Sequence, residues 1–165
     1  MKERTITTVL REYAPAELPE EYRELVRRAR EACLTSYAPY SRFQVGAAIE
    51  LEGGVTVCGS NQENAAYPSG ICAERTAAFY ASASHPGVPM RRIAIAAWTK
   101  RHLPADTPSD DCYQKEPISP CGACRQSLLE YEHAYGPIEV ILSGADRVYV
   151  LPSVESLLPL SFTSF

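Results

Sequence analysis

Apolar and small residues recur every three to four positions between residues 17 and 36, in ELPEEYRELVRRAREACLTS. They are Leu18, Tyr22, Leu25, Val26, Ala29, Ala32 and Cys33. This spacing predicts an amphipathic helix that buries one face. Pro19 suits a first helical position, and Glu20 and Glu21 complement the positive end of the helix dipole.

Five later segments are strand-like because they alternate or stay apolar over short runs. They are FQVGAAIEL (43–51), VTVCGS (55–60), RIAIAAW (92–98), PIEVILS (137–143) and RVYVL (147–151). EGG forms a hairpin turn signal between the first two, and the short link GAD permits only an antiparallel pairing of the last two. Two further helices are predicted, from Cys72 to about Ser84 and from near Cys121 to about Tyr135. The order of elements indicates an α/β protein with a mixed five-stranded sheet covered by helices.

Length and composition favour one globular domain. The chain has 165 residues, of which 45% are hydrophobic, and it shows no repeat and no linker. We therefore predict a single domain over residues 1–165. Residues 1–17 show no regular period and form an N-terminal extension. Residues 99–119 are polar and predict a long surface loop, a kind that is usually functional or mobile.

Charge and cysteine content narrow the classes of partner. A net charge of −4 argues against a nucleic-acid surface, which is normally basic. No run approaches the roughly 18 apolar residues of a membrane span, and the charged start MKERTITTVLREY lacks a signal-peptide core. We expect a cytoplasmic protein with reduced thiols. For its six cysteines, a metal site is favoured over three disulfides.

The motif PCGAC places Cys121 and Cys124 on one side of a helix's first turn. Alone it could be a redox pair, a structural zinc site or a catalytic metal site. The redox interpretation leaves Cys72 without a role. In a metal site, by contrast, Cys72 supplies a third ligand at the start of another helix. Three protein ligands and a water are typical of catalytic zinc, and four of structural zinc. The remaining cysteines are better explained by the core (Cys33), by strand packing (Cys58) and by the loop (Cys112).

The residues after Cys72 suit such a site. Zn²⁺ with three thiolates carries a net charge of −1, which two helix N-termini and Arg75 would partly offset. Glu74 lies two residues after a ligand and can take a proton from a metal-activated water without binding the metal. The simpler alternatives are that Glu74 only complements the helix dipole and that Arg75 is an ordinary surface residue.

C-A-E followed by P-C-x-x-C is the pattern of zinc-dependent nucleobase deaminases. The chain most resembles the small, three-cysteine cytidine deaminases, through YAPYSRFQVGAAI, NQENAAYPSGICAERTAAFYA, PCGACRQ and LLPLSF. The resemblance implies a three-layer cytidine-deaminase-like fold. It also implies one Zn²⁺ per subunit, bound by Cys72, Cys121 and Cys124, with Glu74 as the proton shuttle.

The resemblance also implies a nucleoside subsite. Asn61 and Glu63 would hydrogen-bond the ribose hydroxyls, Phe43 would lie against the pyrimidine, and the Ala73 amide would hold the carbonyl oxygen of the base. Tyr67 would come from a neighbouring subunit of a homotetramer. Without the resemblance, loop capping would explain the two polar residues, and core packing is an alternative for Phe43.

The expected function is hydrolytic deamination of cytidine and 2′-deoxycytidine to the uridine products and ammonia, in pyrimidine salvage. Water activated at the metal would attack C4 while Glu74 protonates N3. One alternative is a deaminase of another aminopyrimidine nucleoside, such as a nucleoside antibiotic. A deaminase of bases in DNA or RNA is disfavoured by the acidic chain. A structural zinc module would need a fourth thiolate and would have no exchangeable water.

Overall fold

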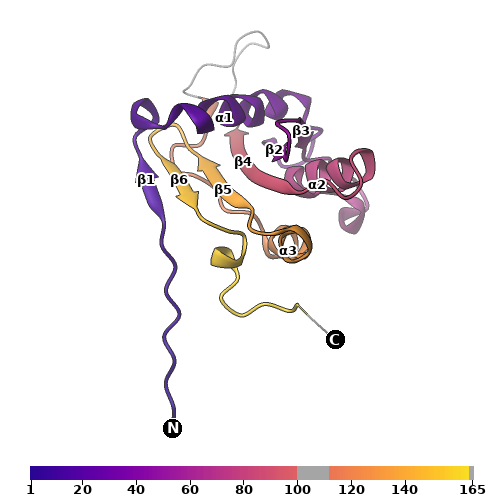
Figure 1. Ribbon diagram of the computed structural model, residues 1–165. Helices are drawn as coiled ribbons and strands as arrows, with labels where there is room; N and C mark the ends of the chain where they lie inside the picture. Colours follow the sequence, from indigo (N-terminus) through magenta and orange to yellow (C-terminus); the bar gives the residue numbers. More distant parts are fainter. Residues whose placement is uncertain (100–111, 164–165) are drawn as a thin grey trace.

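Two long antiparallel strands, β2 (Phe43–Leu51) and β4 (Met90–Thr99), form the middle of one mixed sheet. The computed structural model describes residues 1–99 and 112–163. The sheet has the order β1-β6-β5-β4-β2-β3 (Figure 1). The outer strands are β3 (Thr56–Ser60), β5 (Glu139–Ser143), β6 (Val148–Leu151) and β1 (Arg11–Tyr13). Among the strands of the described residues, only β4 and β5 pair in parallel, so the sheet is mixed as predicted.

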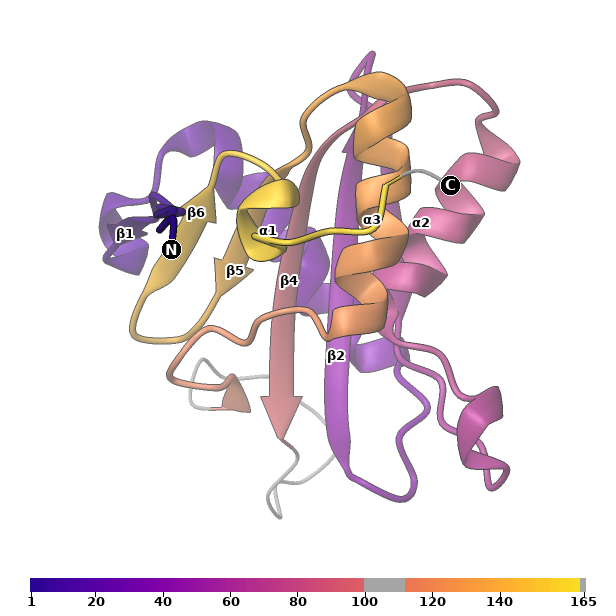
Figure 2. The ribbon, with the colours of Figure 1, turned by 90° about the horizontal axis from the view of Figure 1, so that it is seen from below.

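Three helices cover the sheet from both sides. Helix α1 (Glu20–Ala32) packs on one face, and α2 (Ala73–Ser84) and α3 (Gly122–Tyr135) pack on the other (Figures 1 and 2). The predicted three-layer arrangement is confirmed. Each helix begins within one residue of its predicted start, because Pro19, Cys72 and Cys121 occupy the three N-cap positions.

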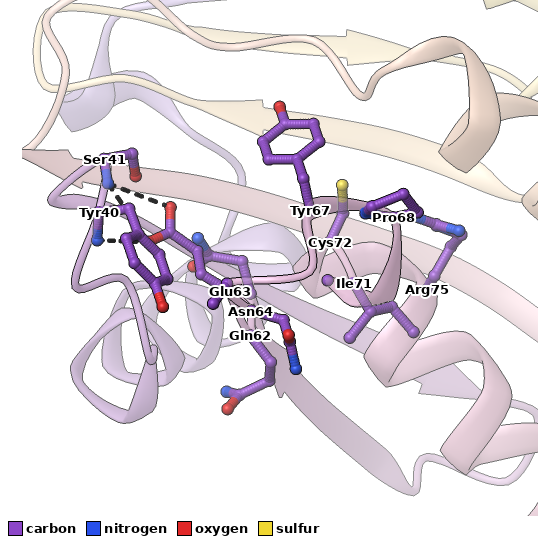
Figure 3. A pocket seen from close by; sticks show the side chains of 13 residues that line it. Tyr40, Ser41, Gln62, Glu63, Asn64, Tyr67, Pro68, Ile71, Cys72 and Arg75 are labelled. Carbon is purple, nitrogen blue, oxygen red and sulfur yellow. Dashed lines mark hydrogen bonds between the residues drawn. The ribbon is translucent and has the colours of Figure 1, made fainter.

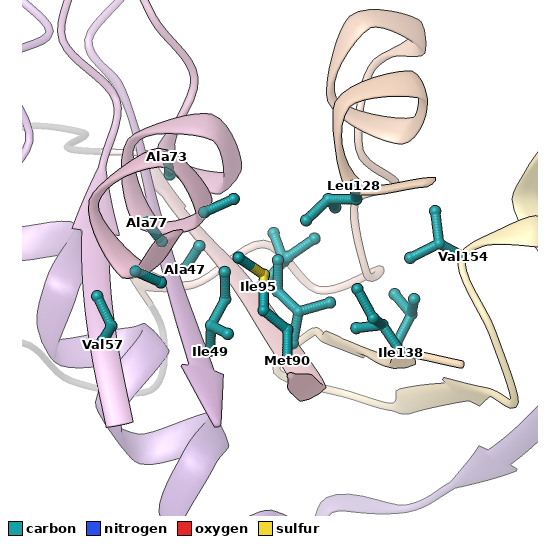
Figure 4. Close-up of a cluster of buried hydrophobic side chains, with 14 of the residues drawn as sticks. Ala47, Ile49, Val57, Ala73, Ala77, Met90, Ile95, Leu128, Ile138 and Val154 are labelled. Atoms are coloured by element: carbon teal, nitrogen blue, oxygen red, sulfur yellow. The ribbon is translucent and has the colours of Figure 1, made fainter. Parts of the chain in front are cut away.

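Alternation along the central strand divides the core in two. Ile93, Ile95 and Ala97 of β4 belong to the cluster under α2 and α3, which Figure 4 shows. The intervening residues, Ala94, Ala96 and Trp98, belong to the cluster under α1. Successive strand residues point to opposite faces, so a strand covered on both sides is apolar throughout.

Two glycines allow helices to approach the sheet closely. A Cβ added at Gly46 of β2 would lie 2.1 Å from the carbonyl oxygen of Ala29 in α1. A Cβ added at Gly59 of β3 would lie 2.5 Å from the backbone nitrogen of Ala77 in α2. Both distances are far below van der Waals contact, so any side chain at either position would displace a helix.

The predicted count of five strands is wrong, because the sheet has six. The additional strand, β1, lies in the N-terminal extension and pairs Arg11 with Val150 and Tyr13 with Val148 of β6. A strand of three residues at a sheet edge leaves no hydrophobic period to detect. Its place in the sheet comes from backbone pairing with a strand distant in sequence.

The predicted loop 99–119 is described only in part, since residues 100–111 lie outside the described residues. Thr99 ends β4, and the segment after residue 111 returns to the sheet, where Tyr113 bridges to Trp98. Cys112, which we placed in an exposed loop, is 4% exposed and belongs to the cluster under α1. It is therefore a core residue on the face opposite α2 and α3.

Candidate active site

The start of α2 and the start of α3 lie side by side and bring two cysteines together. Cys72 is the N-cap of α2 and Cys121 is the N-cap of α3, and neither side chain caps the backbone N–H groups of its helix. Their extended backbone conformations place the side chains beyond the helix ends, near the unpaired N–H groups of the first turns. Each sulfur thus lies at the positive end of a helix dipole.

Cys124, on the first turn of α3, completes a group of three sulfurs. The sulfur atoms of Cys72, Cys121 and Cys124 all lie within 4.8 Å of one another. Cys121 is exposed, Cys72 is half-buried and Cys124 is buried, so the cluster has one open side. Within residues 1–99 and 112–163, no fourth histidine, cysteine or carboxylate joins this group. The donor set fits one zinc ion per chain with a position left open.

The charges around the sulfurs support this assignment. A hydrogen bond with Cys124 is the main cause that lowers the pKa of Cys72 to about 5, and Arg75 lowers it further. The same hydrogen bond and burial raise the pKa of Cys124. The two thiols therefore cannot both ionise easily without a cation between them. The guanidinium of Arg75 lies beside Cys72 and Cys124, and its buried Nε has no hydrogen-bond partner among the described residues.

Glu74 is buried next to this cluster. Its side chain is on the first turn of α2, and the residue is only 4% exposed. Burial raises the pKa of Glu74, and the charge of Cys72 raises it further. A carboxyl group in this environment accepts a proton more readily than an exposed glutamate, which suits proton transfer near neutral pH.

A cavity of about 640 Å³ opens beside Cys72 (Figure 3). Its lining comes from the turn before β2, the loop after β3 and the start of α2. It includes Tyr40, Ser41, Asn61, Gln62, Glu63, Asn64, Ala65, Tyr67, Pro68, Gly70, Ile71, Cys72 and Arg75. Cavities of this size hold small ligands such as a nucleoside.

Glu63 is held by backbone amides at one side of the cavity. Its carboxylate accepts hydrogen bonds from the amide of Tyr40 at 2.8 Å and from the amide of Ser41 at 3.3 Å (Figure 3). A side-chain hydrogen bond from Ser41 is the main cause that lowers the pKa of Glu63. The carboxylate is therefore ionised at neutral pH and oriented before any ligand arrives.

Asn61 lines the same cavity but uses its amide mainly within the protein. Its Oδ1 accepts from the Val45 amide at 2.8 Å and from the Ser36 hydroxyl at 2.6 Å. Its Nδ2 donates to the carbonyl oxygen of Phe43 at 2.9 Å. This network joins the loop after β3 to the start of β2.

The other three predicted substrate contacts differ in their surroundings. Tyr67 lines the cavity and is 92% exposed. Phe43 is outside the cavity lining and packs, partly buried, against the core under α2 and α3. Ala73 is fully buried as the first residue of α2, where its N–H has no acceptor within the helix.

Sequence reasoning missed the turn that holds Glu63. Arg42 is the one non-glycine residue with positive φ, at 57°, in the described part of the chain, and its amide donates to the Ala38 carbonyl. This tight turn exposes the amides of Tyr40 and Ser41. The sequence YAPYSRF signalled a break in the helix but contains no glycine to indicate a left-handed residue.

None of the helices in the described ranges combines the length and apolar character that crossing a lipid bilayer requires.

Comparisons with known proteins agree with this geometry. Residues 19–135 match the family model described as the cytidine and deoxycytidylate deaminase zinc-binding region. The chain is 39% identical over 140 residues to a cytidine deaminase of Halalkalibacterium halodurans, covering 85% of this chain and 92% of that protein. It is 34% identical to the cytidine deaminase of Sporosarcina psychrophila, covering 85% of this chain and 90% of that protein.

Solved structures agree as well. The crystal structure of cytidine deaminase from Burkholderia pseudomallei superposes with a TM-score of 0.69 at 38% identity, covering 86% of this chain and 98% of that one. The cytidine deaminase from Mycobacterium tuberculosis gives a TM-score of 0.65 at 28% identity, covering 88% and 100%. The chain belongs to the zinc-dependent cytidine deaminase family.

Proposed function

We propose that this protein hydrolyses cytidine and 2′-deoxycytidine to uridine and 2′-deoxyuridine, with release of ammonia. The observation that carries the proposal is the cluster of three sulfurs, within 4.8 Å of one another, next to the buried Glu74 and open to a nucleoside-sized cavity. A structural zinc module would need a fourth protein ligand, and no described residue supplies one.

Cys72, Cys121 and Cys124 would hold the zinc ion. When bound, zinc would act as a Lewis acid that lowers the pKa of a water molecule, so that the water can lose a proton and attack the pyrimidine. Glu74 would take one proton from that water and pass it to N3 as the oxygen adds to C4. It would then take the second proton from the hydroxyl on C4 and give it to the amine, which leaves as ammonia when the C4–N4 bond breaks. Its burial excludes bulk water from these transfers, and its raised pKa brings it closer to the working pH.

The remaining predicted residues would orient the substrate. Glu63 accepts hydrogen bonds from the ribose hydroxyls, and Asn61 fixes the loop that carries it. The free N–H of Ala73 donates to the carbonyl oxygen of the base. Phe43, which lies outside the cavity lining, would support the pyrimidine from the side of the core, and Tyr67 of a neighbouring subunit would cover the exposed side of the cavity.

A neutral nucleoside suits the charges of the cavity better than a nucleotide does. Among the described residues of the lining, Arg75 is the one cation, and it lies beside the sulfurs of Cys72 and Cys124. Glu63, which is ionised, would repel a phosphate nearby. We therefore assign the nucleoside, although the matching family model also covers deoxycytidylate deaminases.

We further propose that the enzyme works as a cytoplasmic homotetramer in pyrimidine salvage. Tyr67 supports the assembly, because an aromatic side chain that is 92% exposed at the rim of a cavity suits an intersubunit contact. Cys72, Cys121 and Cys124 are free thiols, and a site built from thiolates suits the reducing conditions of the cytoplasm.

The decisive experiment is a spectrophotometric assay of the zinc-loaded protein with cytidine, deoxycytidine, cytosine and CMP side by side. We expect turnover of both nucleosides and little or none of the free base or the nucleotide. The Glu74→Gln variant should keep its zinc but lose activity by roughly 10²- to 10⁴-fold, the usual contribution of a proton-transfer group.

Size-exclusion chromatography with light scattering tests the assembly separately. Turnover of CMP above that of cytidine would reject the assignment of substrate. Full activity of Glu74→Gln would reject the assignment of the proton shuttle. A monomer that retains full activity would contradict the role of Tyr67.

A further inference from the structure

Arg125 folds back from α3 onto the segment that leads into Cys121. Its Nε donates to the carbonyl oxygen of Pro120 at 2.7 Å, and its Nη2 donates to the Ser119 hydroxyl at 2.9 Å. Arg125 directly follows Cys124 in the sequence. The Arg125 side chain thus links the end of the Cys124 turn to Ser119 and Pro120, which directly precede Cys121.

The segment held in this way has few backbone donors of its own, and Ile118 packs against the core under α2 and α3. Residues 117–121 have no regular secondary structure, and Pro117 and Pro120 have no N–H to donate. Cys121 itself is exposed. A carbonyl bound by a guanidinium therefore contributes directly to where the Cys121 sulfur lies.

The same guanidinium also reaches the C-terminal turn, the short 3₁₀ helix Glu155–Leu157. Its Nη1 donates to the carbonyl oxygen of Leu157 at 3.0 Å. Two helical turns further along α3, the buried carboxylate of Glu132 accepts from the amides of Val154 at 2.7 Å and Glu155 at 2.8 Å. Residues seven apart share a helix face, so Arg125 and Glu132 on one face of α3 both hydrogen-bond to this turn.

We infer that Arg125 is a positioning residue for the metal site, which holds Cys121 in place and links it to the C-terminal turn. The planar guanidinium of arginine donates three hydrogen bonds in fixed directions, so it positions these carbonyls better than the single ammonium group of a lysine. The inference rests on the proposed role of the three cysteines as zinc ligands. It does not depend on which nucleoside is the substrate.

The test compares Arg125→Ala and Arg125→Lys with Arg23→Ala as a matched control. Arg23 also directs its guanidinium to main-chain carbonyls, those of Leu18 and Ala16, but on the opposite side of the sheet. The first measurement is zinc affinity by competition with a chromogenic chelator. The second is the rate at which an alkylating reagent modifies Cys121 in the zinc-free protein, followed by mass spectrometry.

Loss of a residue that orients a metal ligand typically weakens metal binding or activity by roughly 10- to 100-fold. We expect Arg125→Ala to bind zinc at least 10-fold more weakly and to expose Cys121 to faster alkylation. Arg125→Lys should lie between it and the wild type, and Arg23→Ala should match the wild type in both measurements. At saturating zinc, kcat should fall while the KM for cytidine stays constant.

Zinc affinity of Arg125→Ala within fivefold of the wild type would overturn the inference, as would an equal loss in Arg23→Ala. If Arg125→Ala fails to fold, the same criteria apply to Arg125→Lys with a threshold of twofold. A failure of cytidine turnover in the wild type would instead refute the proposed function, because the chelator measurement uses no substrate.

Discussion

Replacing Gly59 with alanine tests how closely the site depends on the packing of α2 against the sheet. The new Cβ would lie 2.5 Å from the backbone nitrogen of Ala77, and 2.9 Å from the Ala73 carbonyl oxygen. All of these atoms belong to the backbone of α2, so no side-chain rotation can relieve the overlap. The helix that carries Cys72 and Glu74 must move as a unit.

The size of the movement follows from these distances. Ordinary contact begins at about 3.4 Å, so α2 has to retreat by roughly 0.9 Å. Inserting a methyl group into a packed core typically costs about 1–3 kcal/mol in the free energy of unfolding. A misplacement of about 1 Å can cost about 10²-fold in rate. We therefore expect kcat for cytidine to fall on the order of 10- to 100-fold in Gly59→Ala.

Gly46→Ala is the matched control, because the same change on β2 meets the carbonyl oxygen of Ala29 in α1 instead. It should lower the free energy of unfolding at least as much while affecting kcat far less. Urea unfolding and steady-state kinetics, at a temperature where both variants are folded, separate the two effects. Equal losses of kcat in the two variants, or a Gly59→Ala variant with kcat within twofold of the wild type, would refute the reasoning.

Three further perturbations probe other parts of the structure. Glu63→Gln removes an ionised acceptor from the cavity. Because a hydrogen bond to a charged group contributes about 1.5–3 kcal/mol, KM for cytidine should rise roughly 10-fold or more. An unchanged KM counts against the ribose contact. Arg42→Gly removes the side chain from a residue in the left-handed conformation, with φ of 57°. Thermal unfolding should show a stability equal to that of the wild type or up to about 1 kcal/mol higher. A clear loss of stability would mean that the Arg42 side chain itself stabilises the turn. Burial, followed by the hydrogen bond to Glu139, raises the pKa of Tyr22 to about 12 in the folded state, compared with a usual value of 10.0. The folded state therefore holds a proton that the unfolded state loses, and between pH 10 and 12 the wild type should lose about 2 kcal/mol more stability than Tyr22→Phe; parallel pH profiles in urea unfolding would contradict this.

The sequence was sufficient to predict the elements that bury a regular face. The predicted strand 43–51 coincides with β2, and α2 and α3 end at the predicted Ser84 and Tyr135. These segments carry strong periodicity or strong start signals, so local physics determines them. The parallel pairing of β4 with β5 and the order of the strands depend on contacts between segments distant in sequence.

The candidate site was predictable where chemistry restricts the residue type. Only cysteines and the nearby carboxylate suit a three-thiol zinc centre, and the structure brings Cys72, Cys121 and Cys124 together. Supporting contacts were not predictable, because almost any donor could serve. The amides that hold Glu63 and the guanidinium of Arg125 act through the path of the backbone, which appears only in three dimensions.

Both helices of the site start at a cysteine of the sulfur cluster whose side chain does not cap the backbone N–H groups of the first turn. A zinc ion bound by these cysteines would therefore hold two otherwise uncapped helix ends together, and part of its binding free energy would become folding free energy. Metal starvation would then reach beyond catalysis, since frayed ends are where proteases begin.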